Sequence, residues 1–175
     1  MGGGRSEGRE LCWMLRSAAA SFLGSHTNRI DAKGRVAAPA DFRRALDLTA
    51  FNGFFCVPSV REAKLDCGGP DYIENLKLMI GRLRPFSAER RALERTILGR
   101  AKPISFDADG RFIIPKELRE HAGIEGEACF VGLGDTFEIR SPGAFSDELS
   151  DLTEIAADAL ALLENPFPDA VGDGQ

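Results

Sequence analysis

The chain has 175 residues, of which 43% are hydrophobic and 28% charged, a composition that suits one compact domain with appendages and excludes a largely disordered protein. Its net charge of −5 is unevenly distributed, because residues 22–102 carry fifteen Lys/Arg against nine Asp/Glu, whereas residues 103–175 carry four against sixteen. DNA affinity follows local phosphate neutralisation, so the net negative charge does not exclude a nucleic-acid partner. No apolar run approaches the roughly 20 residues that a membrane helix needs.

The chemistry-bearing residues do not form a recognisable catalytic or metal-binding pattern. The four cysteines lack Cys-x-x-Cys spacing, and the two histidines stand apart in the chain. We therefore expect reduced thiols, with no metal and no cofactor. No carboxylate pair, nucleophile elbow or phosphate loop indicates an enzyme.

The N-terminal segment, residues 1–21, contains a glycine run, scattered charges and a short apolar patch. The patch is too short for the hydrophobic region of a signal peptide. We expect a disordered N-terminal extension, followed by a strand over residues 25–30 with Arg29 on it.

The next stretch occurs twice in the chain. Residues 31–43 read Asp-Ala-Lys-Gly-Arg-Val-Ala-Ala-Pro-Ala-Asp-Phe-Arg, and residues 107–119 read Asp-Ala-Asp-Gly-Arg-Phe-Ile-Ile-Pro-Lys-Glu-Leu-Arg. The Asp, Ala, Gly, Arg, Pro and closing Arg recur in register, which indicates two copies of one supersecondary unit.

Each copy predicts a strand, a tight turn, a returning strand and a short helix. Asp followed by Gly is typical of a tight turn, since the Asp side chain hydrogen-bonds to the nearby backbone and Gly adopts a positive φ without strain. The returning strands are predicted over residues 36–38 and 112–114. Pro39 and Pro115 then fit the first turn of a short helix, where proline loses no helical hydrogen bond.

Between the copies, Asn52-Gly53 predicts a β-hairpin over residues 50–57, and residues 67–70 predict a loop. Apolar residues at helical spacing predict a helix over residues 71–83, and Ser87 is the expected N-cap of a second one. The many Lys and Arg of these helices indicate a solvated face. The alternative is that they steer DNA or contact another subunit.

After the second copy, strands are expected over residues 128–131 and 136–139, joined by a hairpin turn at Gly132-Leu133-Gly134. A strand rather than a helix follows this Gly-x-Gly, so a nucleotide-binding loop is not indicated. Ser141-Pro142 begins an acidic helix with apolar residues at helical spacing. Either its apolar stripe packs on the rest of the chain, or it serves oligomerisation or partner binding.

Together these features resemble the AbrB/MazE/SpoVT type of DNA-binding unit, and the tandem pair resembles the MraZ family. The resemblance spans residues 22–145 and implies an α+β fold. In that fold two tandem swapped-hairpin units form one pseudo-twofold β-barrel, with linker and C-terminal helices. The supporting motifs are Phe22-Leu23-Gly24-Ser25, Asp31-Ala32-Lys33-Gly34-Arg35, Pro39, Asp107-Ala108-Asp109-Gly110-Arg111, Ile113-Ile114-Pro115 and Phe137-Glu138-Ile139.

The resemblance also implies a division of the chain and a function. The expected parts are the N-terminal extension (1–21), the first AbrB-like repeat (22–68), a helical linker (69–98), the second repeat (99–145) and an acidic C-terminal helix and tail (146–175). The implied function is sequence-specific DNA-binding transcriptional regulation at the promoter of the division and cell-wall gene cluster. The implied partners are direct repeats in double-stranded DNA and further copies of the chain in a ring-like homo-oligomer, in the cytoplasm at the nucleoid, with no membrane and no small-molecule substrate. The alternative is an antitoxin-like protein-interaction module of the same fold.

The two copies differ in charge, which indicates their roles. Copy one has Lys33 where copy two has Asp109, and it carries Arg29 and Arg44 where copy two has Ser105 and Glu120. We therefore expect copy one to face DNA, with its turn arginine bonding a guanine base. The candidate DNA-binding residues are Arg29, Lys33, Gly34, Arg35, Arg44 and Arg111, and the structural turn residues are Asp31, Asp107 and Gly110. An equally good interpretation is that each turn Asp simply pairs with the Arg of its own turn.

Overall fold

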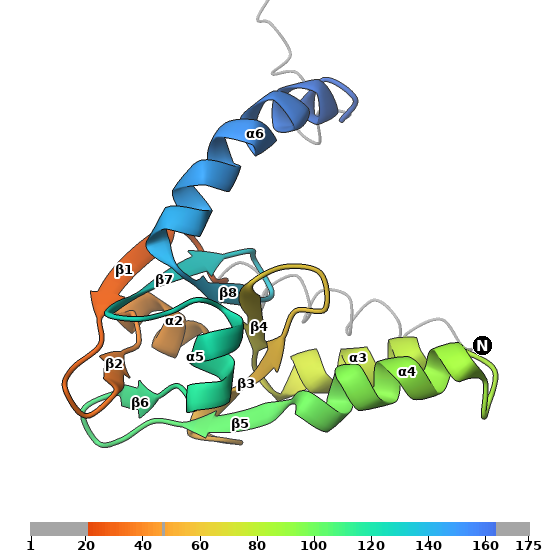
Figure 1. The fold of residues 1–175 in the computed structure, drawn as a ribbon, viewed down its shortest axis with the longest axis horizontal. Coiled ribbons are helices and arrows are strands. Elements are labelled where there is room, and N and C mark those ends of the chain that lie inside the picture. Colours follow the sequence, from red (N-terminus) through yellow and green to blue (C-terminus); the bar gives the residue numbers. More distant parts are fainter. Residues whose placement is uncertain (1–20, 47, 164–175) are drawn as a thin grey trace, which may run out of the picture. The chain divides into compact units, whose positions relative to one another are not determined.

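The computed structural model describes residues 21–46 and 48–163 (Figure 1). The chain forms two compact units, with the boundary between Pro142 and Gly143. The expected N-terminal extension lies outside the described residues, apart from Ser21, and so do residues 164–175 of the expected C-terminal tail.

The first unit contains the two sequence copies and the segment between them. The first half of this unit, around copy one, supplies β1 (Ser25–Arg29), β2 (Arg35–Ala37), α2 (Ala40–Ala45), β3 (Gly53–Pro58) and β4 (Lys64–Gly68). The connecting segment forms α3 (Pro70–Gly81), α4 (Ala88–Thr96) and the short 3-10 helix η1 (Leu98–Arg100). The second half, around copy two, supplies β5 (Lys102–Ser105), β6 (Arg111–Ile113), α5 (Lys116–His121), β7 (Glu127–Gly132) and β8 (Phe137–Arg140).

Six strands form one antiparallel sheet in the order β1-β7-β8-β4-β3-β5. In chain order, β1, β3 and β4 of the first half correspond to β5, β7 and β8 of the second. Exchanging each strand for its counterpart reverses the order without changing any pairing. The fold is therefore α+β, and its sheet repeats the internal duplication of the sequence.

The expected closed barrel is not present, because the sheet order is open. Strands β1 and β5 are edge strands with one sheet neighbour each. After β1 the chain turns into β2, and one isolated β-bridge, Ile30 to Val36, forms between the segments on either side of the turn. Strands β2 and β6 instead form a separate two-stranded ribbon, so the hydrogen-bond ladder does not continue around the unit.

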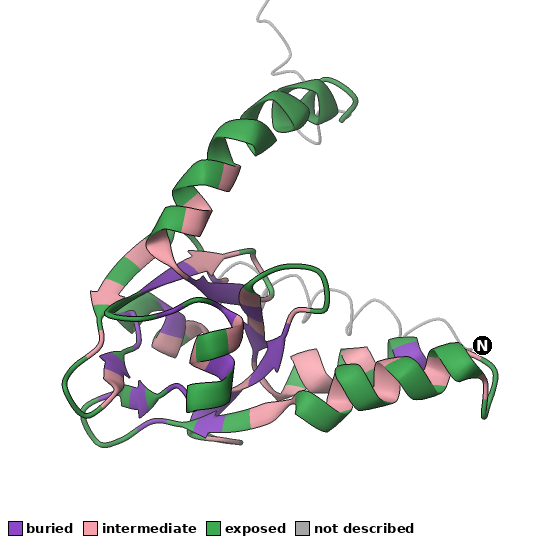
Figure 2. Cartoon of the chain, in the orientation of Figure 1, coloured by how far each residue is buried: buried purple, intermediate pink, exposed green. Residues whose placement is uncertain are grey.

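The core joins both copies through a cluster of aromatic rings. Phe54 and Phe112 meet edge to face with ring centroids 4.9 Å apart, and Phe42 and Phe137 lie 5.3 Å apart in the same manner. Such pairs are worth about 0.5–1.5 kcal/mol beyond their buried area. The rings come from α2, β3, β6 and β8, so neither copy has a core of its own (Figure 2).

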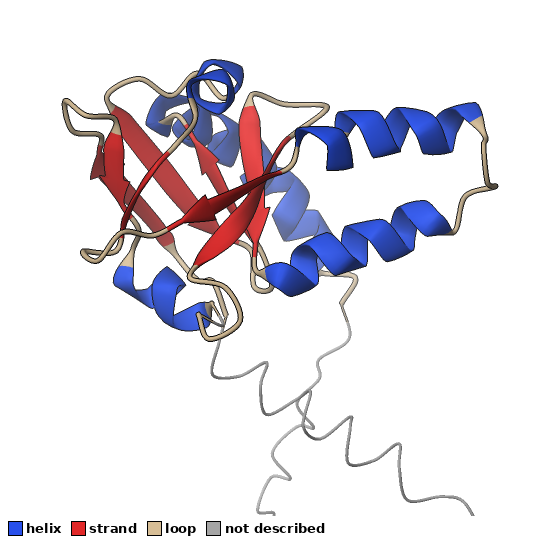
Figure 3. Ribbon diagram, turned by 90° about the horizontal axis from the view of Figure 1, so that it is seen from below, coloured by secondary structure: helices blue, strands red, loops and turns tan. Residues whose placement is uncertain are grey.

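Helices α3 and α4 form a hairpin that projects from the sheet (Figure 3). The predicted N-cap is confirmed, because the Ser87 hydroxyl accepts a hydrogen bond from the Arg90 backbone N–H at 3.2 Å. The prediction of a solvated basic face on this hairpin agrees with Arg82, Arg84 and Arg91, which are exposed. Phe86 at its tip is 87% exposed and has a positive φ of 63°.

Two predictions between the copies are wrong. The expected hairpin over 50–57 does not form, since Gly53 begins β3, which pairs with β4 and β5. This glycine is required by a close approach: a Cβ at Gly53 would clash with the carbonyl of Ile104. Residues Cys67 and Gly68 belong to β4 rather than to a loop, and Leu65 in the same strand is fully buried.

The remaining helix, α6 (Pro142–Leu160), confirms the predicted acidic helix. Several of its apolar residues are exposed within the second unit, and Leu152 and Ile155 have exposed fractions of 45% and 65% (Figure 2). The apolar stripe is therefore not covered by the described residues of the second unit. None of the described helices combines the length and the apolarity that a membrane crossing requires.

Candidate nucleic-acid interface

The first repeated turn joins β1 to β2 and is organised by one carboxylate. Oδ1 of Asp31 accepts hydrogen bonds from the backbone N–H groups of Lys33 and Arg35, both at 2.9 Å. Gly34 occupies the position that needs a positive φ, at 78°, where a side chain would be strained. The Asp31 carboxylate and the positive φ of Gly34 together fix the backbone of this turn.

The Asp31 carboxylate also holds the arginine side chain of its own turn. Nε of Arg35 donates to Oδ2 of Asp31 at 2.8 Å, and Nη2 lies 2.8 Å from the same oxygen. The backbone N–H of Arg35 contributes most to lowering the pKa of Asp31; desolvation opposes this effect, and the Arg35 guanidinium and the Lys33 N–H reinforce it. The carboxylate is therefore ionised at neutral pH.

The second turn, between β5 and β6, has the same backbone geometry. Oδ1 of Asp107 accepts from the N–H groups of Asp109 at 3.0 Å and Arg111 at 2.8 Å, and Gly110 has a φ of 72°. Among the described residues, however, the Arg111 guanidinium has no hydrogen bond or ion pair with Asp107. Pairing of Asp with Arg across the turn is therefore found in copy one and not in copy two.

The ribbon formed by β2 and β6 pairs one strand of each repeat, and the two turns lie at its opposite ends. Its register places Arg35 opposite Ile113 and Ala37 opposite Arg111. The central pair, Val36 and Phe112, points inward with exposed fractions of 1% and 3%. Because side chains alternate along a strand, the four flanking residues share the outward face, with the two arginines at diagonal corners.

The Arg35 guanidinium contacts Asp31 along one edge only, so a second edge of the group is not used by that contact. Asp31 uses the Nε side of the group, and the Arg35 side chain remains 32% exposed. An arginine has five N–H donors in a planar fork, so the Nη1–Nη2 edge remains available to two acceptors. Guanine presents such a pair, O6 and N7, in the major groove, which is wide enough to admit a two-stranded β-ribbon.

The other expected DNA-binding residues are placed differently. Lys33 lies exposed at the tip of the first turn. Arg29 is paired with Glu127 of β7 at 3.5 Å, and Arg44 is paired with Asp41 within α2. Both of these pairs are well exposed, so each contributes little to stability and could be exchanged for a phosphate contact.

Sequence reasoning left one arginine without a role. Arg43, the closing residue of the first repeat, lies across Gly110 so closely that a Cβ there would clash with its guanidinium. Gly110 also accepts a backbone hydrogen bond from Ala38 at 3.1 Å. Helix α2 of copy one therefore supports the turn of copy two. The only sequence signal was the recurrence of this arginine at the end of each repeat.

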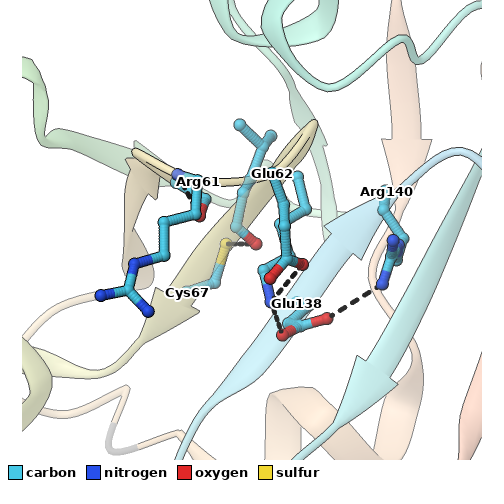
Figure 4. A network of polar contacts seen from close by, with 8 residues as sticks. Arg61, Glu62, Cys67, Glu138 and Arg140 are labelled. Carbon is cyan, nitrogen blue, oxygen red and sulfur yellow. Dashed lines mark hydrogen bonds and ion pairs between the residues drawn. The ribbon is translucent and has the colours of Figure 1, made fainter. Parts of the chain in front are cut away.

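A second polar cluster lies on the sheet, between β4 and β8. Glu138 is only 8% exposed, and its Oε1 lies 2.6 Å from Nζ of Lys64, while Oε2 lies 3.7 Å from Nη1 of Arg140 (Figure 4). Glu62 adds a contact of 3.0 Å to Lys64. Burial alone would lower the pKa of Lys64, but the hydrogen bonds to Glu138 and Glu62 outweigh it and raise that pKa. This cluster is an ion-pair network that ties β4 to β8.

The described cysteines, Cys56, Cys67 and Cys129, are buried free thiols. Cys56 and Cys67 face each other across β3 and β4, and burial raises the pKa of Cys67. Within residues 21–46 and 48–163, no group of three His, Cys, Asp or Glu residues could hold a metal ion.

Comparison with known proteins identifies the family. A family model described as "MraZ protein, putative antitoxin-like" matches residues 97–164. "Transcriptional regulator MraZ" of Rickettsia akari (strain Hartford) is 44% identical over 144 residues, which cover 82% of this chain and 97% of the relative. The protein of the same name from Rickettsia bellii (strain OSU 85-389) is 45% identical over 138 residues, covering 79% of this chain and 92% of the relative. The chain belongs to the MraZ family.

Membership in the MraZ family agrees with the resemblance inferred from the repeated motif. A third relative of the same name, from Rickettsia canadensis (strain McKiel), is 42% identical over 144 residues. The MraZ family model itself covers copy two and all of α6, whereas these relatives match 79–82% of the chain.

Proposed function

We propose that this chain is a sequence-specific, DNA-binding transcriptional regulator that inserts the β2–β6 ribbon into the major groove. The observation that carries the proposal is the diagonal placement of Arg35 and Arg111 on the outward face of that ribbon. Phosphate contacts alone carry no sequence information, so a reader needs side chains that reach base edges. Arg35 meets this need with a guanidinium already oriented by Asp31.

Within this proposal the flanking cations have a different task. Lys33, Arg29 and Arg44 would contact phosphates and set the position of the ribbon. Gly34 allows the backbone of the first turn to come close to the DNA, since it has no side chain. Arg111 would act as the second base-reading residue in a more anionic setting, beside Asp109.

The proposal includes the arrangement and assembly implied by the family. We infer that the two repeats are swapped-hairpin units related by a pseudo-twofold axis, with the repeat, linker and tail boundaries expected from the sequence. One ribbon reads only a few base pairs, so a homo-oligomer that binds spaced direct repeats would gain affinity through avidity. The proposed target is the promoter of the division and cell-wall gene cluster, which places the protein at the nucleoid.

Exposed apolar surface supports self-association. Leu78 and Met79 on α3 are 66% and 61% exposed, and Phe86 follows at the hairpin tip. Leu78 and Met79 are successive residues of α3, and adjoining exposed apolar residues commonly mark protein–protein contacts. Sedimentation of the full chain tests this: a concentration-independent assembly is expected, and a monomer at all concentrations would contradict it.

A second candidate function is an antitoxin-like interaction module. The uncovered apolar residues of α6 favour it, because an amphipathic helix can dock in a groove of another protein. The description of the matching family model also contains this term. Loss of DNA binding in a variant that still binds a protein partner through α6 would favour the module over the regulator.

Footprinting tests the leading proposal. The full chain is titrated against the region upstream of its own gene and against the same fragment in shuffled order. Protection of regularly spaced repeats in the natural fragment alone is expected. Equal, unpatterned protection of both fragments would contradict sequence-specific binding.

A further inference from the structure

The outward face of the ribbon carries one large apolar side chain. Ile113 is 56% exposed, although its neighbours Phe112 and Ile114 are 3% and 2% exposed. It lies directly opposite Arg35 in the antiparallel register. The folded chain thus presents an isoleucine beside the arginine that is best placed to contact a base.

Folding gives no reason for isoleucine at this position. The two neighbouring side chains already fill the core beneath the ribbon, and the Ile113 side chain remains largely in solvent. An isolated exposed apolar residue is ordinary on a protein surface. Here, however, it lies on a ribbon of two three-residue strands that also carries two outward arginines. Its surroundings are therefore those of a recognition surface.

We propose that Ile113 is a specificity-determining residue that packs against the C5-methyl group of a thymine next to the base read by Arg35. The proposal rests on the proposed DNA-binding function and names part of its sequence preference. Thymine is distinguished in the major groove by this methyl group, which apolar side chains contact.

The geometry suits neighbouring base pairs. Side chains directly opposite each other in an antiparallel pair have Cβ atoms about 4.5–5.5 Å apart. Successive bases of one strand are separated by about 3.4 Å along the helix axis. Arg35 and Ile113 can therefore address the same or adjacent base pairs, with the arginine reaching a guanine and the shorter isoleucine reaching a methyl group. Ala37, opposite Arg111, offers a smaller apolar contact at the other end of the ribbon.

The test removes the methyl groups from the DNA. The upstream fragment is prepared once with thymine and once with deoxyuridine at every thymine position, which leaves base pairing intact. Binding of each fragment is measured for the full-length wild type, Ile113→Ala and Val60→Ala. Val60 is the matched control, because it is also 56% exposed but lies between β3 and β4.

Wild type and Val60→Ala should lose roughly fourfold in affinity for each contacted methyl group when thymine is replaced, as expected for one buried methylene equivalent. Ile113→Ala should bind the thymine fragment more weakly and show little further loss on the uridine fragment. Ile113→Val should retain most of the methyl dependence. Thermal melts should coincide, since the Ile113 side chain is mostly in solvent.

Two results would overturn the inference separately from the function. If wild type prefers the natural fragment to a shuffled one but binds thymine and uridine versions equally, Ile113 reads no methyl group. An equal loss on uridine DNA for wild type and Ile113→Ala would assign the effect to DNA shape. If wild type shows no preference for the natural fragment, the proposed function fails and the inference fails with it.

Discussion

The Arg35 guanidinium is held by Asp31, with Nε and Nη2 both 2.8 Å from Oδ2, whereas the described residues show no equivalent contact between Arg111 and Asp107. The two turns have the same backbone hydrogen bonds, so their contacts to the aspartate differ through the arginine side chain. Copy one therefore presents an oriented guanidinium and copy two an unrestrained one. An oriented donor loses less side-chain entropy when it binds a base.

This asymmetry predicts different effects of removing the two aspartates. Asp31→Ala should reduce specific DNA binding more than Asp107→Ala, because only the first change also releases a base-reading arginine. Both changes should loosen their turns, since each carboxylate accepts two backbone N–H groups. Binding to the upstream fragment, measured for both variants beside their melting curves, checks this. A larger binding loss in Asp107→Ala would contradict it.

The lowered pKa of Asp31 predicts a response to acid. Its folded-state pKa lies below the ordinary value of 3.8, so the carboxylate stabilises the fold above about pH 4. That contribution is lost as the pH falls through the folded-state pKa. Stability measured from pH 6 to pH 2 should therefore decline less steeply in Asp31→Asn than in wild type. Parallel curves would show that the turn contacts add nothing.

Charge reversal at the first turn should act through phosphates. Lys33→Glu is expected to weaken binding to all DNA sequences and to reduce the slope of log affinity against log salt by about one unit. Lys77→Glu in α3 makes the same change of charge away from the ribbon and serves as the control. A salt slope in Lys33→Glu that matches wild type would show that this tip does not meet phosphate.

The buried network on the sheet should matter for stability rather than for binding. Glu138→Ala leaves Lys64 and Arg140 without their shared carboxylate and should lower the free energy of unfolding by roughly 3 kcal/mol. Glu62→Ala removes a more exposed partner of Lys64, with 42% side-chain exposure, and should cost less than about 1 kcal/mol. Denaturant titration of both variants measures these losses in the free energy of unfolding. Equal losses would contradict the assignment of Glu138 as the centre of the network.

Local signals predicted the parts of the fold that depend on neighbouring residues. The turns at Asp31 and Asp107 followed from Asp and Gly, and the cap at Ser87 from its hydroxyl. The error at Asn52-Gly53 arose because Gly53 is required by contact with Ile104, which lies 51 positions further along the chain.

The candidate site was only partly predictable for the same reason. Arg35 and Arg111 were identified from their turns, but their meeting on one ribbon depends on pairing between strands of three residues each. Such short strands carry little sequence signal, so Ile113 was not recognised as an outward residue. The different settings of Arg35 and Arg111 could not be inferred from two turns with the same Asp, Gly and Arg.

The most direct test of the account is a titration of Arg35→Ala against the upstream fragment and its shuffled counterpart. Loss of an oriented guanine contact should cost roughly 1–3 kcal/mol per bound subunit on the natural fragment and little on the shuffled one. Arg111→Ala should lose less, and its melting temperature should match that of wild type, because its guanidinium makes no bond to Asp107. If Arg35→Ala retains full preference for the natural fragment, or if Arg111→Ala loses more of it, the DNA sequence is not recognised through copy one and the central claim is wrong.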